Sequence, residues 1–231
     1  MAIPKSKLLV VEGKDDEHAI LHLLRESGVL SKAYDNKTSP LQILSVSESG
    51  ASGKKAVIES IVVRAKETGR QQIGFVLDAD DREGDPPGCS ATWDAVQVQL
   101  QRLGCTPHPH AHSDSASGYI GEMDQPPAKI GVWIMPNHHD DGALEHFLMN
   151  LTKPDDRLLT FAKSSTKQAK EDYRAEFLPS HQAKAELACW LAWQREPAQP
   201  YGIAMQSGKF QVAHQPATDF IAWVRRLFDF P

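Results

Sequence analysis

The sequence predicts an α/β protein: a four-stranded, mainly parallel sheet with helices on both faces, followed by a helical C-terminal extension. Two observations lead to this fold class. Short continuous apolar runs, typical of strands buried on both faces, alternate with longer segments whose apolar residues recur at helical spacing. The alternation of strand and helix continues to about residue 150, which implies parallel strands joined by covering helices.

The first part of the chain contains all four predicted strands. They cover residues 7–11, 41–46, 73–77 and 130–135, and each is a run of mostly apolar residues. The helices that follow them cover residues 15–27, 54–68, 90–103 and 142–150, with apolar side chains on one face. Residues 106–129 are rich in Pro, His, Ser and Gly, and this composition predicts a loop.

The last part of the chain carries only helical patterns. Residues 155–173, 180–194 and 218–228 are the predicted helices. Their tryptophans, Trp190, Trp193 and Trp223, follow the apolar pattern, which favours core positions for all three. The change in pattern divides the chain into an α/β domain, 1–152, and a helical extension, 153–231.

The composition excludes several classes of protein. The 231 residues are 41% hydrophobic and 24% charged, which excludes a disordered or fibrous chain. The three cysteines lie far apart, so neither a zinc knuckle nor a disulfide framework is expected. The apolar run of residues 8–11 is too short for a signal peptide or a membrane span, so we expect a cytoplasmic protein.

Acidic residues follow several of the predicted strands. Glu12 follows the first strand, Asp78 and Asp80 follow the third, and Glu145 lies in the helix after the fourth. Because the carboxyl ends of parallel strands meet at one edge of a sheet, we expect these side chains to gather there. Carboxylates that repel one another favour a hard divalent cation between them, which predicts Mg²⁺ or Mn²⁺ rather than zinc.

The individual carboxylates carry different expectations. Asp78 and Asp80 are two residues apart, so in extended backbone they point the same way. We expect Glu12 to bind its proton more tightly in the metal-free protein, because it faces an apolar wall and other carboxylates. Helix capping or solvation is the favoured interpretation for the other acidic residues near these strands: Asp15, Asp16, Asp81, Glu83 and Asp85.

Two of these segments resemble the signatures of the Toprim domain. Residues 9–16 (LVVEGKDD) contain a Glu-Gly pair after the first strand, and residues 75–80 (FVLDAD) contain an Asp-x-Asp after the third. Topoisomerases, bacterial primases, recombination mediators and nucleases of the overcoming-lysogenisation-defect (OLD) type share this domain. Residues 131–137 (GVWIMPN) and 142–148 (GALEHFL) resemble an uncharacterised group of small Toprim proteins related to the OLD-type nucleases.

The resemblance implies metal-dependent phosphodiester chemistry on nucleic acid, with DNA favoured over RNA. By position, Asp78 and Asp80 correspond to metal-holding residues, Glu12 to a ligand or general acid/base, and Glu145 to a residue that serves a second metal. The nuclease branch also uses a lysine from its C-terminal part, for which Lys184 is the candidate and Lys163 and Lys167 are rivals. Full-length OLD nucleases carry an ATPase domain that this chain lacks, so a separate ATPase is a candidate partner.

Other functions stay open on the sequence alone. A non-catalytic Toprim module that binds DNA or a partner protein is one alternative, and the net charge of −5 favours it or a complex whose other member supplies cationic surface. A metal-dependent sugar-nucleotide glycosyltransferase is a weaker alternative, suggested by the Asp-x-Asp alone. Residues 47–55 fail the phosphate-loop pattern at Glu48 and Lys55, and a plain strand-to-helix turn is the favoured interpretation.

Overall fold

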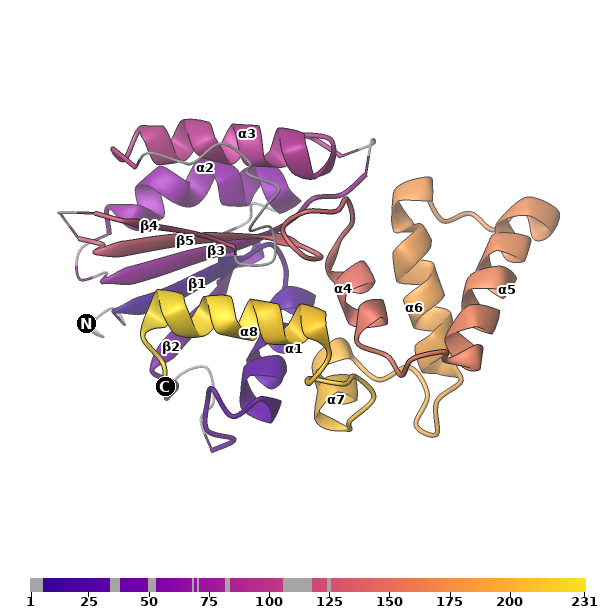
Figure 1. The fold of residues 1–231 in the computed structure, drawn as a ribbon. Helices are drawn as coiled ribbons and strands as arrows, with labels where there is room; N and C mark the ends of the chain where they lie inside the picture. Colours follow the sequence, from indigo (N-terminus) through magenta and orange to yellow (C-terminus); the bar gives the residue numbers. More distant parts are fainter. Residues whose placement is uncertain are drawn as a thin grey trace.

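The structure is a computed structural model that describes residues 6–33, 38–49, 53–67, 69, 71–81, 84–105, 118–123 and 126–231. Figure 1 shows a central sheet between two groups of helices, with a further helical pair beside the sheet. The predicted α/β class, with a mainly parallel sheet and helices on both faces, is therefore confirmed.

The sheet has five strands rather than the four expected. β1 (Lys7–Val11) pairs in parallel with β2 (Leu41–Ser45) on one side and with β3 (Gln72–Asp78) on the other. β5 (Lys129–Met135) extends the parallel series beyond β3, and β4 (Tyr119–Glu122) runs antiparallel to β5. The resulting order is β2-β1-β3-β5-β4, so β1 and β3 are neighbours and end at the same edge.

β4 corrects the expectation of an uninterrupted loop over 106–129. Its four residues include Gly121, so the run is too short and too weakly apolar to show period-two alternation. Tertiary contacts hold it in place: Trp223 Nε1 donates a hydrogen bond to the Tyr119 carbonyl at 3.0 Å, and the Tyr119 ring lies 5.3 Å from that of Trp93. Residues 106–117, which include the alternating histidines His108, His110 and His112, lie outside the described residues.

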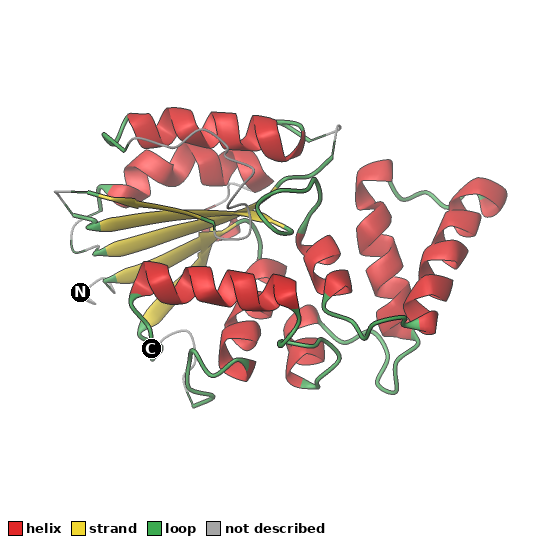
Figure 2. Ribbon diagram, in the orientation of Figure 1, coloured by secondary structure: helices red, strands yellow, loops and turns green. Residues whose placement is uncertain are grey.

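Helices cover both faces of the sheet (Figure 2). Their bounds are α1 Lys14–Glu26, α2 Gly53–Ala65, α3 Gly88–Gln101, α4 Leu144–Asn150, α5 Arg157–Tyr173, α6 Gln182–Ala192, α7 Tyr201–Gln206 and α8 Gln215–Phe228. Alternate strand residues face opposite ways, so Leu8 packs with α2 and α3 while Leu9 packs with α1 and α8. No described helix is long and apolar enough to cross a membrane.

α8 returns to the sheet from the C-terminal part of the chain and packs on β3 and β5 (Figure 1). Two strand glycines make room for it. A Cβ atom at Gly131 would lie 2.5 Å from Leu227 Cδ2, and one at Gly74 would lie 2.8 Å from the same atom. The core under this face therefore contains residues from both ends of the described chain.

α5 and α6 form an antiparallel pair beside the carboxyl ends of the strands (Figure 1). α7 was not expected from the sequence because six residues are too few to show helical periodicity. It packs against α1, where Gly202 lets the two backbones approach: a Cβ there would lie 3.0 Å from the His18 carbonyl oxygen.

One of the three tryptophans expected in the core is exposed instead. Trp190 and Trp223 are buried, as predicted, but Trp193 is 43% exposed. Trp193 follows the last residue of α6, where the helical spacing no longer decides which way a side chain points. Its ring packs 5.3 Å from that of Phe161, which is also exposed.

Filling the glycine gap under α8 should destabilise the fold. We expect Gly131→Ala to lower the free energy of unfolding by about 1–3 kcal/mol, because the added methyl group overpacks the contact with Leu227. Urea denaturation measures the loss. The double variant Gly131→Ala/Leu227→Ala should lose less than the sum of the single variants, since the smaller side chain admits the methyl group. Strictly additive losses would contradict the packing described here.

Candidate functional site

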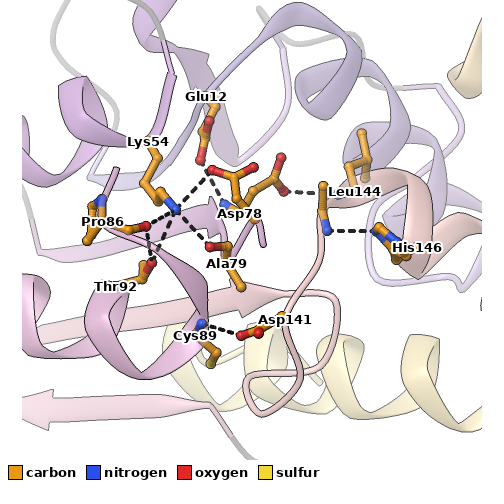
Figure 3. A network of polar contacts seen from close by, with 12 residues as sticks. Glu12, Lys54, Asp78, Ala79, Pro86, Cys89, Thr92, Asp141, Leu144 and His146 are labelled. Atoms are coloured by element: carbon orange, nitrogen blue, oxygen red, sulfur yellow. Dashed lines mark hydrogen bonds and ion pairs between the residues drawn. The ribbon is translucent and has the colours of Figure 1, made fainter. Parts of the chain in front are cut away.

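Two carboxylates meet where the neighbouring strands β1 and β3 end. Glu12 follows β1, and its Oε1 accepts a hydrogen bond from the backbone N–H of Asp78, the last residue of β3, at 2.7 Å. The Asp78 side chain turns the other way along the edge, where its Oδ1 accepts from the N–H of Leu144 at 2.9 Å. Figure 3 shows this pair between α2 and the start of α4.

Asp16 joins the site although the sequence favoured capping or solvation for it. The capping part is correct, because Asp16 Oδ2 accepts from the Gly13 N–H at 3.0 Å in the first turn of α1. The solvation part is wrong, since Asp16 is only 9% exposed. No spacing in the sequence marked this position, because Glu12 lies before the extended N-cap residue Gly13 and outside α1.

Glu145 and Lys184 complete the site from the helical part of the chain. Glu145 lies in the first turn of α4, and its Oε1 accepts a hydrogen bond from the Tyr201 hydroxyl at 3.2 Å. Lys184 Nζ, on α6, lies 3.8 Å from Glu145 Oε1 and 3.8 Å from Asp15 Oδ2. Nothing in the sequence pattern marked Tyr201, because its helix is short and its place beside Glu145 depends on α7 packing against α1.

A cavity of about 330 Å³ connects these groups. Its lining comprises Glu12, Gly13, Lys14, Asp15, Asp16, Ser47, Gly53, Asp78, Leu144, Glu145 and Lys184. The two rival lysines, Lys163 and Lys167, instead line a groove beside α5 and α6 that contains none of the site carboxylates. Of the three candidates, Lys184 is therefore the one that the structure places at this cavity.

Asp80 is the one predicted site residue that does not line this cavity. The expectation that it points the same way as Asp78 required extended backbone, but Asp80 has a φ of 57° and forms an isolated bridge to Gly142. Its Oδ2 lies 2.9 Å from the ammonium group of Lys54, and it does not line the cavity that holds Glu12 and Asp78. Lys54 itself is buried, so it is not presented to a phosphate group at the start of α2.

The histidines that follow β5 have local structural roles. His138 is buried, its Nδ1 accepts from the backbone N–H of Ile134 at 3.1 Å, and its ring lies edge-on to Trp93. His139 is exposed and pairs with Asp140 at 3.1 Å. Neither contact connects a histidine to the carboxylates that line the cavity.

The carboxylates hold their protons more tightly than usual. Burial raises the pKa of Glu12 to about 8, helped by the negative charges of Asp16 and Asp80 and opposed by its hydrogen bond from Asp78. Burial, with the charge of Glu145, raises the pKa of Asp16 to about 7. The pKa of Asp78 is raised well above its ordinary value, first by burial and then by Glu12. The expected rise for Glu12 is confirmed.

The donor set suits Mg²⁺ or Mn²⁺ chemically. Glu12, Asp16, Asp78 and Glu145 offer carboxylate oxygens at one cavity, and their mutual repulsion is what a hard cation would relieve. Within the described ranges, no three acidic, histidine or cysteine side chains already form a metal-holding group. Glu12 and Asp78 each direct one oxygen to a backbone N–H, so a cation would use the other oxygens or displace these hydrogen bonds.

Comparison with known proteins gives one family. A family model described as "Protein of unknown function (DUF3226)" matches residues 6–229. Neither the curated proteins nor the solved structures contain a match. The matched range includes β1 at one end and α8 at the other, so it covers the sheet, the cavity and the helices that contribute Glu145 and Lys184.

The raised pKa values predict how metal-free stability depends on pH. Glu12 has an ordinary pKa of 4.5 and a folded pKa of about 8, so the folded chain binds this proton more tightly than the unfolded chain. Its stabilising contribution is present below about pH 4.5 and is lost as the pH rises towards 8. The stabilising contribution of the Asp16 proton is likewise present below about pH 3.8 and is lost as the pH rises towards 7.

Glu12→Gln should remove the Glu12 part of this pH dependence, because glutamine keeps the acceptor for the Asp78 N–H but carries no proton to lose. In EDTA we expect equal melting temperatures at pH 4.5, and at pH 8 a variant more stable by about 1–2 kcal/mol, roughly 2–8 °C. Thermal melts at several pH values measure this. Asp172→Asn, at an exposed position on α5, is the control and should follow the wild type. A constant difference at all pH values would contradict the assignment.

Proposed function

The chain belongs to the DUF3226 family, and for it we propose metal-dependent phosphodiester chemistry on nucleic acid, as a nuclease or nuclease subunit of the Toprim type. The observation that carries the proposal is the meeting of Glu12, Asp16, Asp78 and Glu145 with Lys184 at one cavity. Burying several carboxylates together costs free energy, and a bound cation would offset that cost. The lysine beside them would in turn favour an anion, so the arrangement fits a site that binds both.

Each residue has a role that its position supports. Asp78 and Glu12, with Asp16 and Glu145, would hold Mg²⁺ or Mn²⁺, and the bound cation would supply Lewis-acid stabilisation to a phosphate oxygen. Glu12 lines the cavity, so its carboxylate would be in place to accept a proton from water, with its pKa lowered by the bound cation from the raised value of the metal-free site. Lys184 is 57% exposed, so its ammonium group can meet a phosphate that enters from solvent.

The charge of the chain bears on its partner. At −5 the protein lacks the overall positive charge that draws a polyanion, and Lys184 alone is a small attraction. A partner protein that contributes cationic surface, such as a separate ATPase, fits this deficit. We favour DNA over RNA as the nucleic acid, on the resemblance of residues 131–137 and 142–148 to small Toprim proteins related to the OLD-type nucleases.

A non-catalytic module that binds DNA or a partner protein is the second candidate. Lys54 favours it, because this lysine already neutralises Asp80, one of the residues that an Asp-x-Asp metal site would use. A nuclease would cleave nucleic acid, whereas a non-catalytic module would only bind its partner. Incubation with plasmid DNA, single-stranded DNA and RNA in Mn²⁺ tests for cleavage, and a sugar nucleotide in parallel tests the glycosyltransferase alternative.

Glu12→Gln should lower the rate of phosphodiester cleavage in Mn²⁺ by at least about a hundredfold, the usual scale for loss of a general base. The control is the same variant's melting temperature, which should be no lower than that of the wild type at pH 8. Equal cleavage rates would make Glu12 a structural residue. Absence of cleavage by both proteins would favour the non-catalytic module.

Lys184→Met tests the lysine. We expect it to lower cleavage by roughly tenfold to a hundredfold, because it removes the cation nearest to Glu145 while keeping the aliphatic stem. Lys167→Met is the matched control, since it removes the same charge from the neighbouring helix, outside the cavity. Similar losses in both variants would point to a general effect of net charge instead of a role at the site.

A further inference from the structure

Lys54 is a buried lysine at the start of α2, beside the candidate site. Its side chain is 3% exposed, whereas lysine is almost never fully buried unless it is paired. The pairing partner is Asp80, whose Oδ2 lies 2.9 Å from Lys54 Nζ. The buried cation therefore has a specific counter-charge in the segment that follows β3.

The remaining contacts of Lys54 fix its ammonium group. Nζ donates to the carbonyl oxygens of Ala79 at 2.7 Å and Pro86 at 2.6 Å, and lies 3.3 Å from Thr92 Oγ1 (Figure 3). An ammonium group has three donors, and these oxygens together with Asp80 use all of them. Lys54 is therefore held in place and has no donor left for a substrate phosphate.

The backbone holds Asp80 towards this lysine. Asp80 exchanges two backbone hydrogen bonds with Gly142, at 2.7 and 2.8 Å, and has a left-handed conformation instead of the extended backbone that would align its side chain with that of Asp78. Gly84 closes over the pair: a Cβ there would lie 2.7 Å from Asp80 Cβ and 3.1 Å from Lys54 Nζ. A divalent cation bound to Asp80 would have to sit beside a fixed ammonium group, where the two positive charges repel each other.

We propose that Lys54 takes the place of a divalent cation at Asp80, so that the site binds one divalent cation, on the Glu12–Asp78 side, instead of two. The proposal rests on the proposed function for the identity of that single cation. Lys54 is then a positioning residue: it neutralises Asp80 and secures the segment after β3, and it does not touch substrate. Asp80 serves as the anchor of Lys54 and not as a metal ligand.

Counting bound Mn²⁺ tests the proposal without reference to activity. Calorimetric titration, supported by the electron paramagnetic resonance signal of free Mn²⁺, should show one bound ion for the wild type and one for Asp80→Asn, with affinities within about threefold. Lys54→Gln frees the Asp80 carboxylate, so it should bind an additional Mn²⁺, and Lys54→Gln/Asp80→Asn should lose that ion again. Asp78→Asn should lose the ion that the wild type binds.

Lys55→Gln is the matched control. It removes the same charge from the next residue, whose side chain is 68% exposed and lies 3.7 Å from the exposed Asp85. It should leave the number of Mn²⁺ ions unchanged. If Lys54→Gln does not fold by circular dichroism, Asp80→Asn decides alone: an unchanged titration supports the proposal, and loss of an ion overturns it.

The remaining outcomes separate this proposal from the proposed function. Two ions in the wild type, one of which needs Asp80, overturn the role of Lys54 and leave the nuclease proposal standing. An unchanged ion count in folded Lys54→Gln also overturns it. No ion in the wild type contradicts the metal-dependent function. The role of Lys54 then stands only if Lys54→Gln binds an ion that Lys54→Gln/Asp80→Asn does not.

Discussion

Mutual repulsion among partly buried carboxylates is the constraint that organises one whole edge of this sheet. Each carboxylate has a hydrogen-bond donor or a cation that lowers the cost of burying it. These partners are the Gly13 and Asp78 backbone N–H groups, the Leu144 N–H, the Tyr201 hydroxyl and the Lys54 ammonium group. They come from the starts of α1, α2, α4 and α7 and from the end of β3, so the placement of those elements and the charge of the site cannot be changed separately.

The helical part of the chain belongs to this edge as much as the strands do. Lys184 on α6 and Tyr201 on α7 both reach Glu145, and α7 in turn packs on α1, which carries Asp16. Two contacts of opposite sign meet at Glu145: its carboxylate pairs with Lys184, and its negative charge raises the pKa of neighbouring Asp16. A cation bound at this cavity would change the charge around Glu145, and therefore the contacts that α6 and α7 make with it.

The regular elements were predictable, and the contacts between them were not. Apolar runs and helical spacing located the four parallel strands and most helices, because these patterns record which side faces the core. β4 and α7 are too short to show a period, and tertiary packing holds them. The candidate site residues show the same difference. Strand ends and the Toprim resemblance were enough to pick out four of them from the sequence: Glu12, Asp78, Glu145 and Lys184. Asp16 and Lys54 depend on which helix start lies beside which strand end, and a single sequence does not contain that proximity.

The seating of α8 on β3 and β5 also sets a limit on when the protein can complete its core. α8 is synthesised after every strand of the sheet and after all the helices around the cavity. Until it leaves the ribosome, the glycine-lined surface at Gly74 and Gly131, with Trp133 beside it, has no cover and presents apolar side chains to solvent. The nascent chain therefore passes through a stage in which its sheet is complete in sequence but open on one face. In that stage, chaperone binding and aggregation compete with the arrival of a single helix.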